Sequence, residues 1–213
     1  MRKMGLVILG LSLALSTSQS YAADKSFTTV QKAIDSLKVA EEVRAGYKRD
    51  NFKHWVGTGN GCDSRKSVII SEAIKSPVVE KGCVIKGGEW LSIYDNVKVT
   101  EAGKLDVDHM VPLAEAWDSG AQEWDAKKRE LYANDQTDPR HLIAVTGSSN
   151  RSKSDQDPAD WMPTNKSYTC DYIANWVSIK VRWSLSIDAK EKSALINNLN
   201  GCKKTKIVVK PLP

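Results

Sequence analysis

Long apolar runs are scarce in this chain of 213 residues, and beyond its first residues none is long enough to span a bilayer. Neither sign of charge is in large excess, since 31 Lys and Arg face 26 Asp and Glu, giving a formal charge of +5. This balance is compatible with a polyanionic partner without indicating one. With 41% hydrophobic and 27% charged residues, 13 Gly and 7 Pro, the composition excludes a wholly disordered or collagen-like chain. No internal repeat is visible.

The one apolar run occupies residues 6–15, after two basic residues and before a polar stretch that ends in small residues. This order is typical of a secretory signal peptide, here residues 1–23, with cleavage after Ala22 or Ala23. A membrane anchor would need about 20 apolar residues, and no cysteine lies at the cut to carry a lipid. We therefore expect an exported protein, periplasmic or secreted, without a membrane attachment once the signal is removed.

Cysteine is also sparse, and the four residues are Cys62, Cys83, Cys170 and Cys202. The absence of any C-x-x-C pair disfavours a zinc site built from thiolates. An even number of cysteines in an exported chain indicates two disulfides, for which three pairings are possible. Proximity in sequence favours Cys62–Cys83 and Cys170–Cys202, because these pairs close short local loops.

The spacing of apolar residues predicts an α+β fold, with a single, mainly helical domain over residues 24–204 and a small β-hairpin in its middle. Residues 205–213 are basic, end in prolines and are expected to form a loosely held tail. We expect helices at residues 26–48, 114–132 with a break near Ser119, 172–185 and 189–199.

Short runs rich in branched apolar residues predict the strands. Ser148 or Ser149 is placed to cap a short helix that begins near Asn150. Residues 68–74 fit a helix or a strand equally well. We expect strands at residues 84–90 (two around a Gly-Gly turn), 96–100, 105–113 up to Pro112, and 142–145.

Histidine occurs three times, and the context of His109 is the most informative. It follows Asp108 in the segment DVDHMVPL, residues 106–113. A carboxylate can hold a hard divalent cation, and a neutral imidazole can take a proton from water. An Asp-His pair alone is a weak signal, and His54 has no comparable context, so we expect His54 to be structural.

A second segment, RHLIAVTGSSNRSKSD at residues 140–155, runs from a strand through a turn into the helix that Asn150 opens. The amide oxygen of Asn150 is a neutral, hard ligand suited to Mg²⁺. Lys153 follows three residues later on nearly the same helical face. The start of a helix also favours an anion such as a phosphate.

Together and in this order, DHMVPL and HLIAVTGSSNRSKSD resemble the HNH, or ββα-metal, nuclease motif. They are similar in particular to the GmrSD-type HNH domain and to the exported bacterial HNH endonucleases. GNGCDSR, GGEW, EAWDSGA, YAND and DPADWMP resemble the same exported group, so the resemblance spans residues 43–202. It implies a ββα-metal hairpin-helix core at about residues 104–160 and an endonuclease that hydrolyses DNA, with RNA as an alternative substrate, at low sequence specificity.

The resemblance also implies roles for individual residues. Asp108 and Asn150 would bind one divalent metal, and His109 would be the general base that activates water. His141 stands where the family usually has an asparagine, so we expect only a supporting role in orienting the loop that carries His109. An oxygen-rich pair of ligands fits Mg²⁺ best, Mn²⁺ as an alternative and Zn²⁺ less well.

Basic residues near this motif are the candidates for substrate binding. Arg151 and Lys153 are expected to contact phosphates because they adjoin Asn150. Arg65, in GNGCDSR, is placed with them by the resemblance alone. If His109 must be neutral to accept a proton, activity is expected to fall below about pH 6.5, the ordinary pKa of histidine.

The alternation of a regular strand bears on the acidic residues. Asp106 lies on the same face as Asp108 and competes with it as a metal ligand. The same alternation points Asp108 and His109 to opposite faces, so a shared site requires a bend or the end of the strand.

Two other functions stay open. One is an inactive exported module of the same fold that binds nucleic acid or an envelope partner. The other is a different metal hydrolase, such as a phosphodiesterase for small substrates. We expect a monomer in either case.

Overall fold

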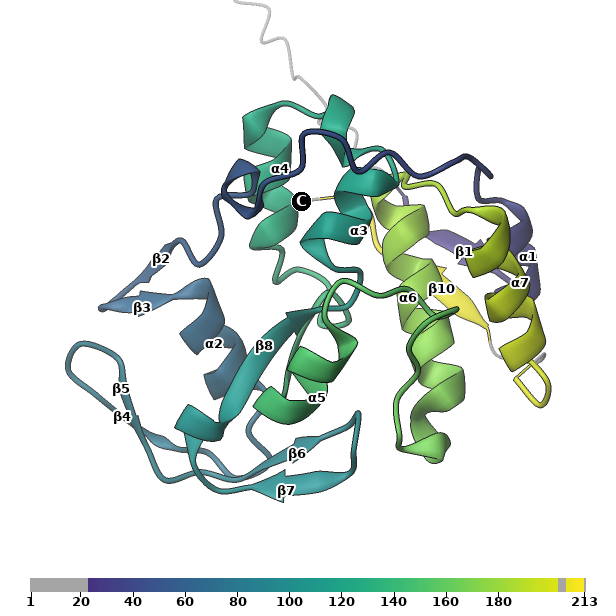
Figure 1. The fold of residues 1–213 in the computed structure, drawn as a ribbon. Helices are drawn as coiled ribbons and strands as arrows, with labels where there is room; N and C mark the ends of the chain where they lie inside the picture. The colour runs from purple at the N-terminus through teal and green to yellow at the C-terminus, as the bar shows by residue number, and fades with distance from the viewer. Residues whose placement is uncertain (1–22, 203–205, 213) are drawn as a thin grey trace, which may run out of the picture.

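The computed structural model describes residues 23–202 and 206–212 and has an α+β architecture (Figure 1). The predicted signal peptide, apart from Ala23, lies outside the described residues. None of the helices in the described part of the chain is long and apolar enough to cross a membrane. The helices are α1 (Val30–Asp35), α2 (Ser64–Ser71), α3 (Leu113–Asp118), α4 (Ala126–Ala133), α5 (Gly147–Lys153), α6 (Thr169–Trp183) and α7 (Ala189–Asn198).

The predicted α+β class is confirmed, but the strands in residues 23–202 and 206–212 form five antiparallel pairs, so the expectation of one small hairpin is wrong. The expected hairpin at residues 84–90 is also wrong, because β5 pairs with β4 and β6 pairs with β7. The pairs are β1 (Lys25–Phe27) with β10 (Ile207–Val209), β2 (Gly57–Gly59) with β3 (Cys62–Asp63), β4 (Val78–Glu80) with β5 (Val84–Lys86), β6 (Trp90–Ser92) with β7 (Val97–Val99), and β8 (Leu105–His109) with β9 (Leu142–Thr146).

Two apolar cores hold the fold together. The larger core surrounds α6, whose Ile173, Trp176 and Val177 are fully buried, and packs α6 against α1, α7 and β10. The smaller core lies where α2 contacts β8 and β9, and it consists of Val68, Ile69, Trp90, Val99, Leu105, Val107, Leu142 and Ala144. The β8–β9 pair contributes to both cores and lies between them (Figure 1).

The helices in the second half of the chain follow the predicted pattern. The break near Ser119 is real, since α3 ends at Asp118 and Gly120 takes a φ of +122°, which a glycine adopts without strain. Asp125 then caps α4 through its side chain, and Asp188 caps α7 in the same way. Of the two options for residues 68–74, the helix is the one that forms, as the end of α2.

Both ends of the described chain differ from expectation. The helix predicted at residues 26–48 shrinks to α1, because the backbone beyond it bonds to other elements, with Ala40 N donating to Ile187 O and Val43 N donating to Asp118 O. The expected loose tail is also wrong for residues 206–212. Ile207 and Val209 are each 2% exposed, and β10 pairs with β1.

Disulfide pairing follows sequence proximity as predicted. Cys62 bonds to Cys83, and Cys170 bonds to Cys202. The first bridge ties the β2–β3 pair to the loop between β4 and β5, and the second ties the start of α6 to the segment after α7.

Candidate functional site

The predicted motif folds as an antiparallel strand pair followed at once by a helix. Asp108 pairs with Ile143 and His109 with Leu142, and α5 packs against both strands (Figure 1). The helix begins at Gly147, before the expected Asn150. Its cap is the side chain of Thr146, which accepts a hydrogen bond from Ser149 N, so the prediction of Ser148 or Ser149 as the cap is wrong.

A cavity of about 480 Å³ opens at the end of β8 and brings together the three predicted catalytic residues. Asp108, His109 and Asn150 all line this cavity. His109 is the last residue of β8, and at this end of the strand both Asp108 and His109 reach the same cavity, although neighbouring side chains of a strand point in opposite directions. The other lining residues with polar side chains are Tyr47, Arg49, Arg151, Ser154 and Asp155.

One oxygen of Asp108 is held by the protein. Its Oδ2 accepts hydrogen bonds from the Tyr94 hydroxyl at 2.6 Å and lies 2.8 Å from Lys153 Nζ. Burial raises the pKa of Asp108, and the ammonium of Lys153 opposes that rise. Among the described residues, Oδ1 accepts no hydrogen bond, so this oxygen is left for a ligand in the cavity.

His109 has a defined tautomer, because its Nε2 lies 2.9 Å from the carbonyl oxygen of Ala133. A carbonyl only accepts, so Nε2 carries the proton and Nδ1 keeps its lone pair in the neutral ring. The ring lies between Trp55, with centroids 5.4 Å apart, and Tyr132, with centroids 6.4 Å apart. Burial holds the pKa of His109 well below its ordinary value, and the neighbouring His141 lowers it further.

Asn150 is oriented by a carboxylate on β8. Its Nδ2 donates to Asp106 Oδ2 at 3.3 Å, which leaves the amide oxygen Oδ1 as a free acceptor. Asp106 does not line the 480 Å³ cavity. Its Oδ2 contacts Asn150 Nδ2 and lies 3.5 Å from Arg151 Nη1. The geometry therefore favours Asp108 over Asp106 as the carboxylate of the site.

His141 is fully buried beside His109, in the predicted supporting position. Its Nε2 lies 2.6 Å from Tyr132 O, and its own carbonyl accepts from Met110 N at 2.9 Å. The two histidines thus face neighbouring carbonyls of the last turn of α4, which lack the usual helical partners. Burial lowers the pKa of His141 to about 4.

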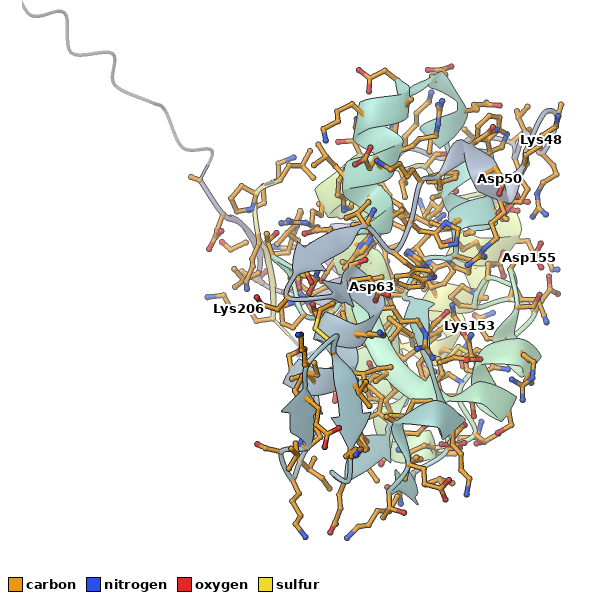
Figure 2. The ribbon with its side chains drawn as sticks, turned by 90° about the vertical axis from the view of Figure 1, so that its left-hand side faces the viewer. Lys48, Asp50, Asp63, Lys153, Asp155 and Lys206 are labelled. Atoms are coloured by element: carbon orange, nitrogen blue, oxygen red, sulfur yellow. A yellow bond between two sulfur atoms is a disulfide. The ribbon has the colours of Figure 1, made fainter. Side chains whose placement is uncertain are left out.

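The three predicted phosphate-binding residues differ in position. Arg151 is exposed and lines the cavity, as expected. The expectation that Lys153 contacts phosphates is wrong. Its side chain is 0% exposed and lies inside the molecule, where Nζ bonds Asp108 and the His109 carbonyl (Figure 2). Arg65 is also corrected, because its Nη2 donates to Leu105 O at 2.6 Å and it does not line the cavity.

Sequence reasoning missed Tyr94 and Trp55, which contact the predicted residues from elsewhere in the chain. Tyr94 is fully buried, and its hydroxyl fixes Asp108. Trp55 packs against His109 with the two rings tilted, from a backbone with a φ of +58°, a left-handed conformation that costs a bulky residue about 1–2 kcal/mol. Neither residue belongs to a pattern that would have identified it. His54 Nδ1 lies 2.8 Å from Phe52 O, and its ring packs edge-on against Trp55.

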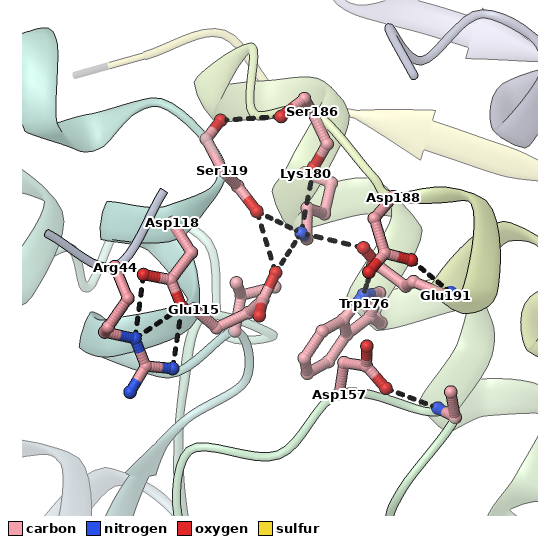
Figure 3. Close-up of polar contacts among 12 residues, drawn as sticks. Arg44, Glu115, Asp118, Ser119, Asp157, Trp176, Lys180, Ser186, Asp188 and Glu191 are labelled. Carbon is pink, nitrogen blue, oxygen red and sulfur yellow. Dashed lines mark hydrogen bonds and ion pairs between the residues drawn. The ribbon is translucent and has the colours of Figure 1, made fainter. Parts of the chain in front are cut away.

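A second group of carboxylates, which we call the acidic cluster, consists of Glu42, Glu115, Asp118, Asp157 and Asp188. Lys180, fully buried, lies 2.5 Å from Glu115 and 3.1 Å from Glu191, and Arg44 bonds Asp118 (Figure 3). Burial raises the pKa of Glu42 to about 7, and the charge of Glu115 adds to this rise. The five carboxyl groups of the cluster thus outnumber the two cations that contact it.

Residues 74–198 match the family described as the C-terminal domain of GmrSD restriction endonucleases. The chain belongs to this family. The predicted resemblance to a GmrSD-type domain is thereby confirmed. The chain is also 39% identical over 178 residues to an uncharacterized secreted protein of Arthroderma benhamiae, a similarity that covers 83% of this chain and 86% of that relative. No solved structure shows a significant match. The GmrSD-type region contains Tyr94 and both halves of the motif, whereas Arg49 and Trp55 precede it.

Proposed function

We propose that this protein is a metal-dependent endonuclease that hydrolyses phosphodiester bonds in DNA, with the β8–β9–α5 unit as the ββα-metal core. The observation that carries the proposal is the convergence of Asp108, Asn150 and His109 on one cavity. Membership of a restriction-endonuclease family supports nucleic acid as the substrate.

The residues of the cavity fit a hard divalent cation. Asp108 Oδ1 and Asn150 Oδ1 are both oxygen donors without a hydrogen bond from the described residues, and each side chain is held in place through its other polar atom. A site with only two protein ligands suits Mg²⁺, because Mg²⁺ usually keeps several of its bound waters. When bound there, the cation would neutralise charge on the phosphate and stabilise the leaving 3′ oxygen.

His109 is suited to take the proton from the attacking water. Its low pKa keeps the ring neutral, and the contact from Nε2 to Ala133 O leaves Nδ1 as the basic nitrogen. Once Nδ1 is protonated, the same carbonyl stabilises the charge on the ring. General-base catalysis of this kind contributes on the order of 10²–10⁴-fold to the rate.

Substrate contacts fall to the exposed cations of the cavity, Arg49 and Arg151. Such contacts bind the phosphate backbone and carry no sequence information, so we propose low sequence specificity and strong dependence on salt. Two disulfides and the name of the secreted relative support action outside the cytoplasm.

Plasmid nicking by the oxidised mature protein tests the proposal. We expect nicking with Mg²⁺ or Mn²⁺ and none with EDTA. Because His109 is buried, the variant His109→Ala is expected to melt at a lower temperature. Assayed well below that temperature, it should keep its DNA binding but nick at least about a hundredfold more slowly.

The matched control is His54→Ala, which removes an imidazole outside the cavity lining and should nick at the wild-type rate. Binding without nicking by the wild type would indicate an inactive module instead. Equal nicking by wild type and His109→Ala would remove His109 from the mechanism.

A further inference from the structure

A second cavity, of about 440 Å³, adjoins the first and shares Arg151 with it. Its walls come from β7, the turn at residues 100–104 and the start of α5. Asp106, which orients Asn150, also lines it. The proposed catalytic cavity therefore continues along the surface past α5.

The lining of the second cavity has more cationic than anionic side chains. Lys98, Lys104 and Arg151 line it, against the single carboxylate of Asp106. Lys98 lies 3.4 Å from Glu89 and Lys104 lies 2.6 Å from Glu101, but both lysines are exposed, as is Glu101, while Glu89 is half-buried. Exposed pairs of this kind stabilise the protein by about 0–1 kcal/mol, so both ammonium groups are available to an anion.

Arg151 lines both cavities, with its side chain exposed and its Nη1 3.5 Å from Asp106 Oδ2. A Cβ atom on Gly147 would lie 2.7 Å from Arg151 Nη1 and 3.3 Å from Asp106 Oδ2. The absence of a side chain at Gly147 thus allows the guanidinium to lie over the start of α5. From there it can reach a phosphate in either cavity.

Arg44 links the first cavity to the acidic cluster. Asp155 lines the first cavity and bonds Arg44, which also bonds Asp118 of the acidic cluster. In Figure 1, α3, which carries Asp118, and β7, which carries Lys98, lie on either side of α5. A polyanion in the first cavity is therefore repelled by the acidic cluster and attracted toward the second cavity.

We propose that the nucleic-acid strand leaves the catalytic cavity across Arg151 and enters the second cavity, where Lys98 and Lys104 bind its phosphates. This rests on the proposed function and adds to it the path and direction of the substrate. The path uses residues of β7 and of the turn before β8, outside the two motif segments.

Binding of a 20-base-pair DNA duplex to the oxidised mature protein, measured in EDTA at several KCl concentrations, tests the path. The variant is Lys98→Ala/Lys104→Ala. The control is Lys86→Ala/Lys190→Ala, which removes two equally exposed lysines from ion pairs elsewhere, with Glu80 and Asp160. Both variants change the net charge by the same amount, so general electrostatics affects them alike.

We expect the slope of log K against log salt to become less steep by about 1–2 in the first variant, because each lost phosphate contact removes about 0.9. The control should keep the wild-type slope. Equal slopes in all three proteins, or an equal change in the control, would overturn the path.

Wild-type plasmid nicking with Mg²⁺, measured in parallel, separates this inference from the proposed function. Nicking with unchanged slopes overturns the path alone. A changed slope without nicking supports the path as a DNA-binding surface and overturns the endonuclease.

Discussion

Acid should destabilise this protein through His141, by an amount that its environment sets. The imidazole is fully buried among aromatic rings, and burial lowers its pKa to about 4 in the folded protein. In the unfolded chain the pKa is about 6.5. The unfolded state therefore binds more protons below pH 6.5, so stability falls as the pH falls toward 4 and changes no further below that value.

The size of this loss follows from the two pKa values. Their difference corresponds to about 3 kcal/mol, most of which is lost by pH 4.5. Several buried carboxyl groups titrate over the same range, so the contribution of His141 must be isolated by substitution. His141→Gln keeps an N–H donor for Tyr132 O but does not titrate.

Urea denaturation of wild type and His141→Gln at pH 7 and pH 4.5, with disulfides intact, measures the effect. The variant is expected to be less stable at pH 7, because it packs less well. The difference in unfolding free energy between the two proteins should shrink by about 2–3 kcal/mol at pH 4.5. A difference that is the same at both pH values would refute the buried, neutral state of His141.

Three further predictions concern the site and the buried charges. Because burial lowers the pKa of His109, kcat/KM for cleavage should hold to below pH 6.5, and an acidic limb at or above that value would contradict the burial of the base. Tyr94→Phe removes the hydroxyl that fixes Asp108 Oδ2 and should weaken Mn²⁺ binding by about 10–100-fold in a calorimetric titration. Unchanged affinity would show that the hydroxyl does not orient the carboxylate. Lys180→Met leaves Glu115 and Glu191 buried without their cation and should lower the free energy of unfolding, measured in urea, by about 3–5 kcal/mol. An unchanged midpoint of the urea denaturation curve would show that the ammonium contributes nothing to stability.

Local patterns were sufficient for the central part of the site. The two motif segments predicted a strand that contains the Asp-His pair and a second strand leading into a helix, and β8, β9 and α5 have that order, although β8 ends at His109 and not near Pro112. The start of α5 was misplaced because the threonine directly after the predicted strand caps it. Choosing among Thr146, Ser148 and Ser149 requires the backbone geometry, which the sequence does not contain.

Tertiary packing decided what the patterns could not. Lys153 is on the helical face predicted, but α5 packs against β8, so that face points at Asp108 instead of solvent. Tyr94 and Trp55 reach the site from other segments, and only the folded arrangement brings them there. The three-residue strand β10 was missed because its pairing with β1 joins the two ends of the described chain.

Titration of Mn²⁺ into the metal-free protein, followed by electron paramagnetic resonance, tests the central claim most directly. Wild type should hold one Mn²⁺ in the catalytic cavity, and Asp108→Asn should weaken this binding at least about tenfold. Glu42→Gln, which neutralises a carboxylate of the acidic cluster, is the matched control and should leave that affinity unchanged. Wild-type affinity in Asp108→Asn would contradict the assignment of the metal to the β8–β9–α5 unit.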